Sequence, residues 1–232
     1  MFKRIAAVVL VLCVAACAAP RPRPVTPWLP GQSTASLQAL PPPGEYQIDS
    51  SSSELRLLVY RAGSLSNLGH NHVMVNRAVT GQVRIGDGIS ASSFSLSASV
   101  NDFVVDDAQA RSEEGGDFPS DIPEDAKQGT RRNMLGSAVL NAAEFPSITV
   151  KSVSLTGPLD ALNAEVEISV AGHTSTLSMP FALQGDAHQL IAAGSTELRQ
   201  SVLGLKPLSL LNGALQVQDA MHLKFKITAL TN

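Results

Sequence analysis

The segment SELRLLV, residues 53–59, decides the fold class of this chain. Leu55, Leu57 and Val59 occupy every second position, and the charged Arg56 stands between two of them. Successive side chains of a β-strand point to opposite faces, so this spacing predicts a strand with one buried face. A helix would instead repeat its apolar residues every three or four positions.

The same period of two recurs from residue 45 onward, and clusters of glycine, asparagine, aspartate and serine separate the runs. Many short runs predict an all-β antiparallel domain, either a sandwich or a closed barrel. A change of phase near Asn76-Arg77 predicts a break between two strands, and the spacing within residues 148–155 predicts a β-bulge. The other alternating residues are Tyr46 and Ile48; Val73 and Val75; Val79, Val83 and Ile85; Phe94, Leu96, Ala98 and Val100; Val166, Ile168 and Val170; Leu177, Met179 and Phe181; Leu215 and Val217; and Leu223, Phe225 and Ile227.

Residues 121–135 depart from this pattern and predict one short helix. The segment opens with an N-cap aspartate and an early proline, carries a glutamate at the capping-box position, and is followed by Gly136. The acidic stretch before it, residues 106–117, contains two glycines and predicts a loop. The carboxylate pair Asp106-Asp107 is most simply a solvated part of that loop.

Residues 1–16 have the pattern of an export signal. Lys3 and Arg4 precede an uncharged apolar run that is shorter than the roughly 20 residues of a transmembrane helix. The run ends in Val-Ala-Ala-Cys, which resembles the lipobox of bacterial lipoproteins. The resemblance implies cleavage before Cys17, acylation of Cys17 with palmitate-type chains and, because Ala18 follows, an outer-membrane lipoprotein facing the periplasm. The alternative is an ordinary signal peptide that is cut elsewhere.

Residues 17–44 predict a linker rather than a folded element. Closely spaced prolines favour an extended, disordered chain that tethers the domain. Residues 45–232 are long enough for one domain with a sizeable core. The only cysteines are Cys13 and Cys17, so this domain has to be stable without a disulfide. The net charge of −3 gives no indication of a nucleic-acid partner.

Four segments in order resemble the YceI-like family of exported, lipocalin-like barrels. The matching segments are residues 46–49 with 53–59, residues 144–152, residues 168–174, and residues 198–207 with 213–219. The resemblance implies a barrel around a long apolar tunnel that holds an amphiphile, which is a polyisoprenoid in some members. The sequence departs from the family pattern at Arg61, where many members have a histidine, and within residues 131–135 and 139–141.

The alternation and the family's strand placement together predict which side chains face the interior and contact a ligand. A closed barrel of about eight strands is either filled by its own side chains or holds one small ligand. Aromatic residues make up 4% of the chain, which is compatible with both arrangements. The expected inward residues are Leu55, Leu57, Val59, Val166, Ile168, Leu177 and Phe225.

His70 and His72 are the candidate polar site. Their i, i+2 spacing places both imidazoles on one side of an extended segment. Three interpretations remain open: a structural turn, a contact with the headgroup of a ligand, or a metal site completed by a carboxylate or a third histidine such as His222. Because no third ligand stands at a diagnostic spacing, we expect polar residues at a barrel rim and no catalytic metal centre.

No motif for an activated nucleophile, a phosphate-binding loop or a metalloprotease helix occurs in the sequence. The prediction is therefore a non-enzymatic protein without a cofactor. We expect it to bind, sequester or transport an apolar amphiphile, such as a polyisoprenoid, a quinone-like molecule or a fatty lipid. Its expected partners are that lipid-like molecule and, through the N-terminal lipid anchor, the membrane; a homodimer is left open. The alternatives are a metal-binding or enzymatic protein centred on His70 and His72, and an envelope interaction module with a filled barrel.

Overall fold

The computed structural model describes residue 37 and residues 39–231. The expected signal peptide, Cys17 and most of the expected linker lie outside the described residues, so what was predicted for them stays a prediction. Among the described residues, no helix has the length and apolar character needed to cross a membrane.

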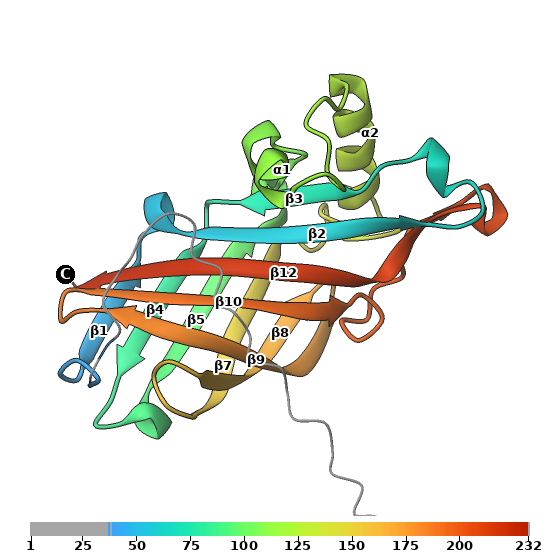
Figure 1. The fold of residues 1–232 in the computed structure, drawn as a ribbon. Coiled ribbons are helices and arrows are strands. Elements are labelled where there is room, and N and C mark those ends of the chain that lie inside the picture. Colours follow the sequence, from blue (N-terminus) through green and yellow to red (C-terminus); the bar gives the residue numbers. More distant parts are fainter. Residues whose placement is uncertain (1–36, 38, 232) are drawn as a thin grey trace, which may run out of the picture.

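The described chain folds mainly into β-strands, with two α-helices and several short 3-10 turns (Figure 1). The helices are α1 (Ala108–Glu114) and α2 (Glu124–Leu135). The strands are β1 (Gly44–Ile48), β2 (Glu54–Ala62), β3 (His72–Asn76), β4 (Thr80–Ile85), β5 (Ser93–Ser99), β6 (Val104–Val105), β7 (Ser147–Thr156), β8 (Leu162–Val170), β9 (His173–Gly185), β10 (Gln189–Arg199), β11 (Ser209–Leu210) and β12 (Leu215–Thr231).

The strands form one antiparallel sheet that closes on itself. Its neighbours follow the order β1, β4, β5, β7, β8, β9, β10 and β12, and β12 returns to β1 through pairs such as Tyr46 with Thr231. The predicted lipocalin-like barrel of about eight antiparallel strands is therefore confirmed. Closure leaves no free edge among these strands, which removes a template for aggregation.

Bends divide several walls of the barrel into two strands each. The long β12 pairs with β2 along residues 216–226 and with β1 along residues 229–231, so β1 and β2 follow one another on the same side of it. β3 and β4 likewise follow one another, and the break between them is the predicted phase change near Asn76-Arg77. The predicted bulge in β7 is present as a register shift between Ser152 and Ser154.

The prediction of a single helix over residues 121–135 was incomplete, because the structure has two. α2 begins later than predicted, at Glu124, since Pro123 keeps the residue before it out of helical geometry. α1 lies within the stretch predicted as a loop. Asp107 caps α1 by accepting a hydrogen bond from the backbone N–H of Ala110 at 2.9 Å, and helix-forming residues follow.

α1 covers the outer face of β2 and β3. Both strands carry apolar side chains on this face as well as on the inner one, which explains the consecutive leucines of the SELRLLV segment. Packing between helix and strands excludes water from a second, smaller core. Its buried members are Leu58, Val73, Val75, Ala110 and Phe118.

A buried arginine fastens α1 to the barrel. Arg56 of β2 is only 2% exposed and pairs with Glu113 and Glu114 of α1, each at 2.8 Å, and with Glu54. Lys224 of β12 also pairs with Glu114. A buried charge is tolerated only where opposite charges and hydrogen bonds satisfy it, and Arg56 has several such partners.

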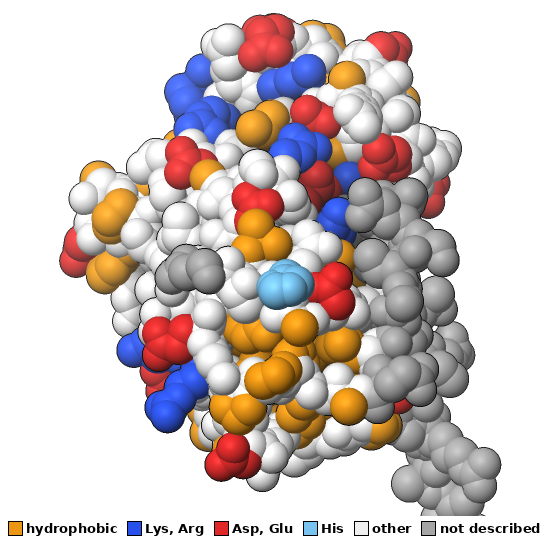
Figure 2. Space-filling view, turned by 90° about the vertical axis from the view of Figure 1, so that its left-hand side faces the viewer, with side chains coloured by type: hydrophobic (Ala, Val, Ile, Leu, Met, Phe, Trp, Pro, Cys, Tyr) orange, Lys and Arg blue, Asp and Glu red, His pale blue; other side chains and the backbone are white. Residues whose placement is uncertain are grey.

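The last residues of the predicted linker pack on one end of the barrel. Leu37 and Leu40 lie against a cluster that includes Tyr46, Ile85 and Leu190. Figure 2 views this end of the molecule, the end at which β1 and the C-terminus lie, and hydrophobic side chains gather on it. This part of the predicted linker is therefore packed against the domain rather than extended away from it.

Candidate binding cavity and histidine–aspartate cluster

A cavity of about 550 Å³ occupies the interior of the barrel. It extends from Leu40 and Leu190, at the end seen in Figure 2, to Leu68 and Leu210 at the opposite end. Its wall consists mainly of leucine, valine, isoleucine and methionine side chains. This size lies within the usual range for small-molecule pockets. The alternative of a barrel filled by its own side chains is therefore wrong for this chain.

Most of the predicted inward residues line this cavity. Those that line it are Leu55, Leu57, Val59, Ile168 and Phe225. Val166 and Leu177 belong to the same hydrophobic core but do not contribute to the cavity wall. A contact between any of them and a ligand stays a prediction.

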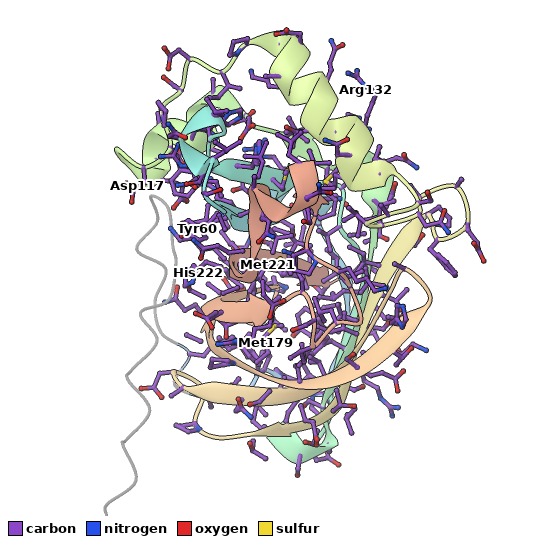
Figure 3. All side chains as sticks on the ribbon, turned by 90° about the vertical axis from the view of Figure 1, so that its right-hand side faces the viewer. Tyr60, Asp117, Arg132, Met179, Met221 and His222 are labelled. Carbon is purple, nitrogen blue, oxygen red and sulfur yellow. The ribbon has the colours of Figure 1, made fainter. Side chains whose placement is uncertain are left out.

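Figure 3 looks at the end opposite to that of Figure 2 and shows the inner and outer faces of β12. Met221 lines the cavity, as does Met179 from β9, and both lie toward the barrel interior. His222 follows Met221 and lies on the other face, where its Nε2 is 2.6 Å from the Ser195 hydroxyl. Burial and the nearby charge of Lys224 lower the pKa of His222.

Polar side chains of the wall gather where β2 ends and β12 begins. Arg61 pairs in register with Val217 of β12, and Gln216 lies beside it in the same strand pair. Gln200 donates a hydrogen bond to the Gln218 carbonyl at 2.8 Å. The polar wall residues of this region are Arg61, His70, His72, Gln200 and Gln216. We call this end of the cavity the polar mouth.

Arg61 holds the loop at the polar mouth in place. Its Nη1 donates to the carbonyl of Ser66 at 3.0 Å and to that of Gly69 at 2.7 Å. The side chain of Asn71 in turn accepts a hydrogen bond from the backbone N–H of Arg61 at 3.0 Å. These bonds fix residues 63–69 against β2 and so position His70, which follows directly.

Exposed leucines surround the polar mouth. Leu68 is 71% exposed and Leu211 66%, and Leu65 and Leu210 are also exposed. The two loops that carry them meet, because the backbone N–H of Leu65 donates to the Ala214 carbonyl at 2.8 Å. Leu68 and Leu210 also line the cavity, so the apolar rim is continuous with the interior.

His70 and His72 lie side by side, as their spacing predicts. Their ring centroids are 4.4 Å apart, and both rings line the cavity at the polar mouth. His72 Nδ1 lies 2.8 Å from Oδ2 of Asp106, and His70 Nε2 lies 3.4 Å from the same oxygen. The structure therefore brings a carboxylate that is distant in sequence to the two histidines. His222, the other third ligand considered, lies elsewhere against Ser195.

Asp106 is fully buried, so its interpretation as part of a solvated loop was wrong. Its Oδ1 accepts hydrogen bonds from Arg111 Nη1 at 2.5 Å and from the backbone N–H of Val73 at 2.9 Å. Burial opposes ionisation, but the imidazoles of His70 and His72 and the Val73 N–H outweigh it and hold the pKa of Asp106 well below its usual range.

Sequence reasoning could not have found Asp106, because it is separated from His72 by 34 positions and follows a two-residue strand. The only local signal is the pattern Asp106-Asp107 before helix-forming residues, which marks the N-terminus of α1. Arg111, fully buried on α1, was missed for the same reason.

Comparisons with known proteins agree with this geometry. The model of the YceI-like domain matches residues 46–229. The solved structure of Burkholderia cenocepacia BcnA is similar, with a TM-score of 0.56 at 12% sequence identity, over 78% of this chain and 98% of that one. A polyisoprenoid binding domain from Saccharophagus degradans has a TM-score of 0.53 at 10% identity, over 81% of this chain and 98% of that one. Comparison with curated protein sequences gave no match.

At these identities the two solved structures establish the likeness of fold alone, whereas the family model covers most of the chain. The barrel, its interior cavity and the matched residues 46–229 together place the protein in one family. The chain belongs to the YceI-like family.

Proposed function

We propose that this protein binds an amphiphile with a long apolar chain inside its barrel and sequesters or carries it in the cell envelope. The observation that carries the proposal is the apolar cavity of about 550 Å³ with polar side chains gathered at one end. Each buried methylene of a ligand contributes about 0.8 kcal/mol, so an apolar chain binds firmly without many polar contacts. The polar mouth then receives the headgroup.

The class of ligand follows from the wall and from the family. A wall of aliphatic side chains favours a flexible hydrocarbon such as a polyisoprenoid, the tail of a quinone or a fatty chain. The structurally similar domain from Saccharophagus degradans is described as polyisoprenoid binding, which supports this class. The sequence motifs give no reason to assign catalysis, so the proposed role is binding alone.

The location is part of the proposal. The Val-Ala-Ala-Cys sequence supports lipidation at Cys17 and an anchor in the outer membrane that faces the periplasm. The exposed leucines at the polar mouth support entry of the ligand from an apolar phase at that end. The two loops that carry these leucines, residues 63–69 and 208–214, contain no aspartate or glutamate that would repel an anionic membrane.

The test compares Leu57→Arg with Val153→Arg. Leu57 lines the cavity, whereas Val153 on β7 is 60% exposed and serves as the matched control. Lipid that copurifies with each protein is extracted and quantified per chain by mass spectrometry, and circular dichroism monitors folding. We expect Leu57→Arg to lose most of its lipid and Val153→Arg to keep it.

Because an unpaired buried charge is costly, Leu57→Arg also carries a risk of unfolding. The uncharged variant Ala192→Phe, which adds a ring at the cavity wall, keeps the proposal testable in that case. Folded protein of both variants with full lipid occupancy would contradict binding in the cavity.

A further inference from the structure

Three potential metal ligands converge at the polar mouth. His70, His72 and Asp106 each offer an atom that lies within 4.8 Å of the other two. They come from the loop before β3, from the first residue of β3, and from the residue after β6, so only the folded barrel assembles them. Two imidazoles and one carboxylate are the ligand types that bind borderline divalent ions such as zinc.

The surroundings orient Asp106 toward the two histidines. Asp106 has a φ of +56°, a left-handed conformation that aspartate adopts more readily than most residues other than glycine. Its backbone N–H donates to the Val73 carbonyl at 2.7 Å, and its Oδ1 is occupied by Val73 and Arg111. These bonds fix Asp106 so that its Oδ2 is directed at the two imidazoles.

One ring nitrogen of His70 is buried at this point without a hydrogen-bond partner. Its Nε2 is shielded from solvent and makes no hydrogen bond, although Oδ2 of Asp106 is 3.4 Å away. A buried polar atom without a partner costs about 1–3 kcal/mol, so such atoms call for an explanation. A cation bound between His70 Nε2 and Asp106 Oδ2 would remove that cost.

The distances suit a small ion. Two ligand atoms at 2.0–2.1 Å from a tetrahedral zinc ion lie about 3.3–3.4 Å apart, which is the separation of His70 Nε2 and Asp106 Oδ2. His72 Nδ1, now 2.8 Å from Oδ2, has to move by about half an ångström to reach the same geometry. Asp106 is held by Val73 and Arg111 in the way that outer partners orient metal ligands in other proteins.

We propose that His70, His72 and Asp106 bind one divalent transition-metal ion, for which zinc is the probe, at the polar mouth of the cavity. Both histidines line the cavity, so the ion lies at the cavity wall and keeps a coordination position for water or another oxygen ligand. The site does not depend on what the cavity holds, and it can be tested on protein freed of lipid.

The experiment measures zinc binding by isothermal titration calorimetry. The full chain is prepared without a histidine tag, treated with a chelator and titrated at neutral pH, and bound metal is counted by elemental analysis. We expect one zinc ion per chain. His70→Gln and His72→Gln should each weaken binding by at least about tenfold, and the double variant should abolish it.

His188→Gln is the matched control, because His188 is an exposed histidine in the β9–β10 hairpin at the other end of the barrel. Its zinc affinity should equal that of the wild type. Asp106→Asn leaves buried Arg111 without its carboxylate and is expected to fold poorly, so the histidine variants decide the result. Wild-type protein that takes up no zinc, nickel or copper in stoichiometric amount would overturn the proposal, as would a folded double variant that binds as the wild type does.

Discussion

Filling the cavity is the sharpest perturbation that the structure offers. Ala192 of β10 lines the cavity, and its replacement by phenylalanine introduces a ring into that space. The ring displaces about four methylenes of a bound chain, each worth about 0.8 kcal/mol, so the expected loss is about 3 kcal/mol. This corresponds to an increase in Kd of about a hundredfold.

The assay measures displacement of the fluorescent apolar probe N-phenylnaphthylamine by geranylgeraniol, a polyisoprenoid alcohol. Val153→Phe is the matched control, since it places the same ring on an exposed position of β7 and should leave the Kd unchanged. Circular dichroism and thermal unfolding establish that both variants are folded. An Ala192→Phe protein that is folded and binds geranylgeraniol with wild-type affinity would refute the assignment of the ligand to the barrel interior.

Three further predictions concern the anchor, the helix attachment and acid stability. Cys17→Ser should abolish incorporation of radiolabelled palmitate, and labelling equal to the wild type would contradict lipidation. Arg56→Ala should lower the free energy of unfolding in urea by about 3 kcal/mol, the lower end of the range for a broken buried ion pair, because Glu114 keeps Lys224 and Glu113 is partly exposed; a loss below about 1 kcal/mol would contradict the role of this network. Asp106 has a lowered pKa in the folded state, so its contribution to stability is present above the unfolded-state pKa of about 3.9 and is lost as pH falls below it. Urea midpoints of the wild type should therefore fall most steeply between about pH 4 and pH 2. A midpoint that stays constant over this range would contradict the role of Asp106.

The regular strands of the barrel were predictable because apolar residues alternate with polar ones, as buried positions alternate with exposed ones. β8 shows this well: Val166, Ile168 and Val170 are buried, and the residues between them are more exposed. β10 gave no such signal. Ile191 and Gly194 are three positions apart and so point to opposite faces of the strand, yet both are buried, and small residues further break the alternation. The Cβ of any larger residue at Gly194 would come within 2.6 Å of the Pro180 carbonyl, so close packing explains that glycine.

The polar site was only half predictable, and the reason is physical. The spacing of His70 and His72 places both on one face through the local geometry of an extended segment. Asp106 joins them only through pairing of β3 with β6 and the left-handed turn that follows. A contact that depends on long-range strand pairing leaves no periodic trace in the sequence. The position of α1 was unpredictable for the same reason, because it depends on contacts with Arg56 and with the apolar outer face of β2.

The ligand itself can be observed by native mass spectrometry of the full-length protein isolated in mild detergent from cells that produce it. If the barrel binds an amphiphile, the spectrum contains a species heavier than the chain by one molecule, and organic extraction releases a compound with a long hydrocarbon chain. This species should be absent or strongly reduced in Ala192→Phe and retained in Val153→Phe. A wild-type protein found only at its own covalent mass, which also fails to take up geranylgeraniol at saturating concentration, would contradict the proposed function.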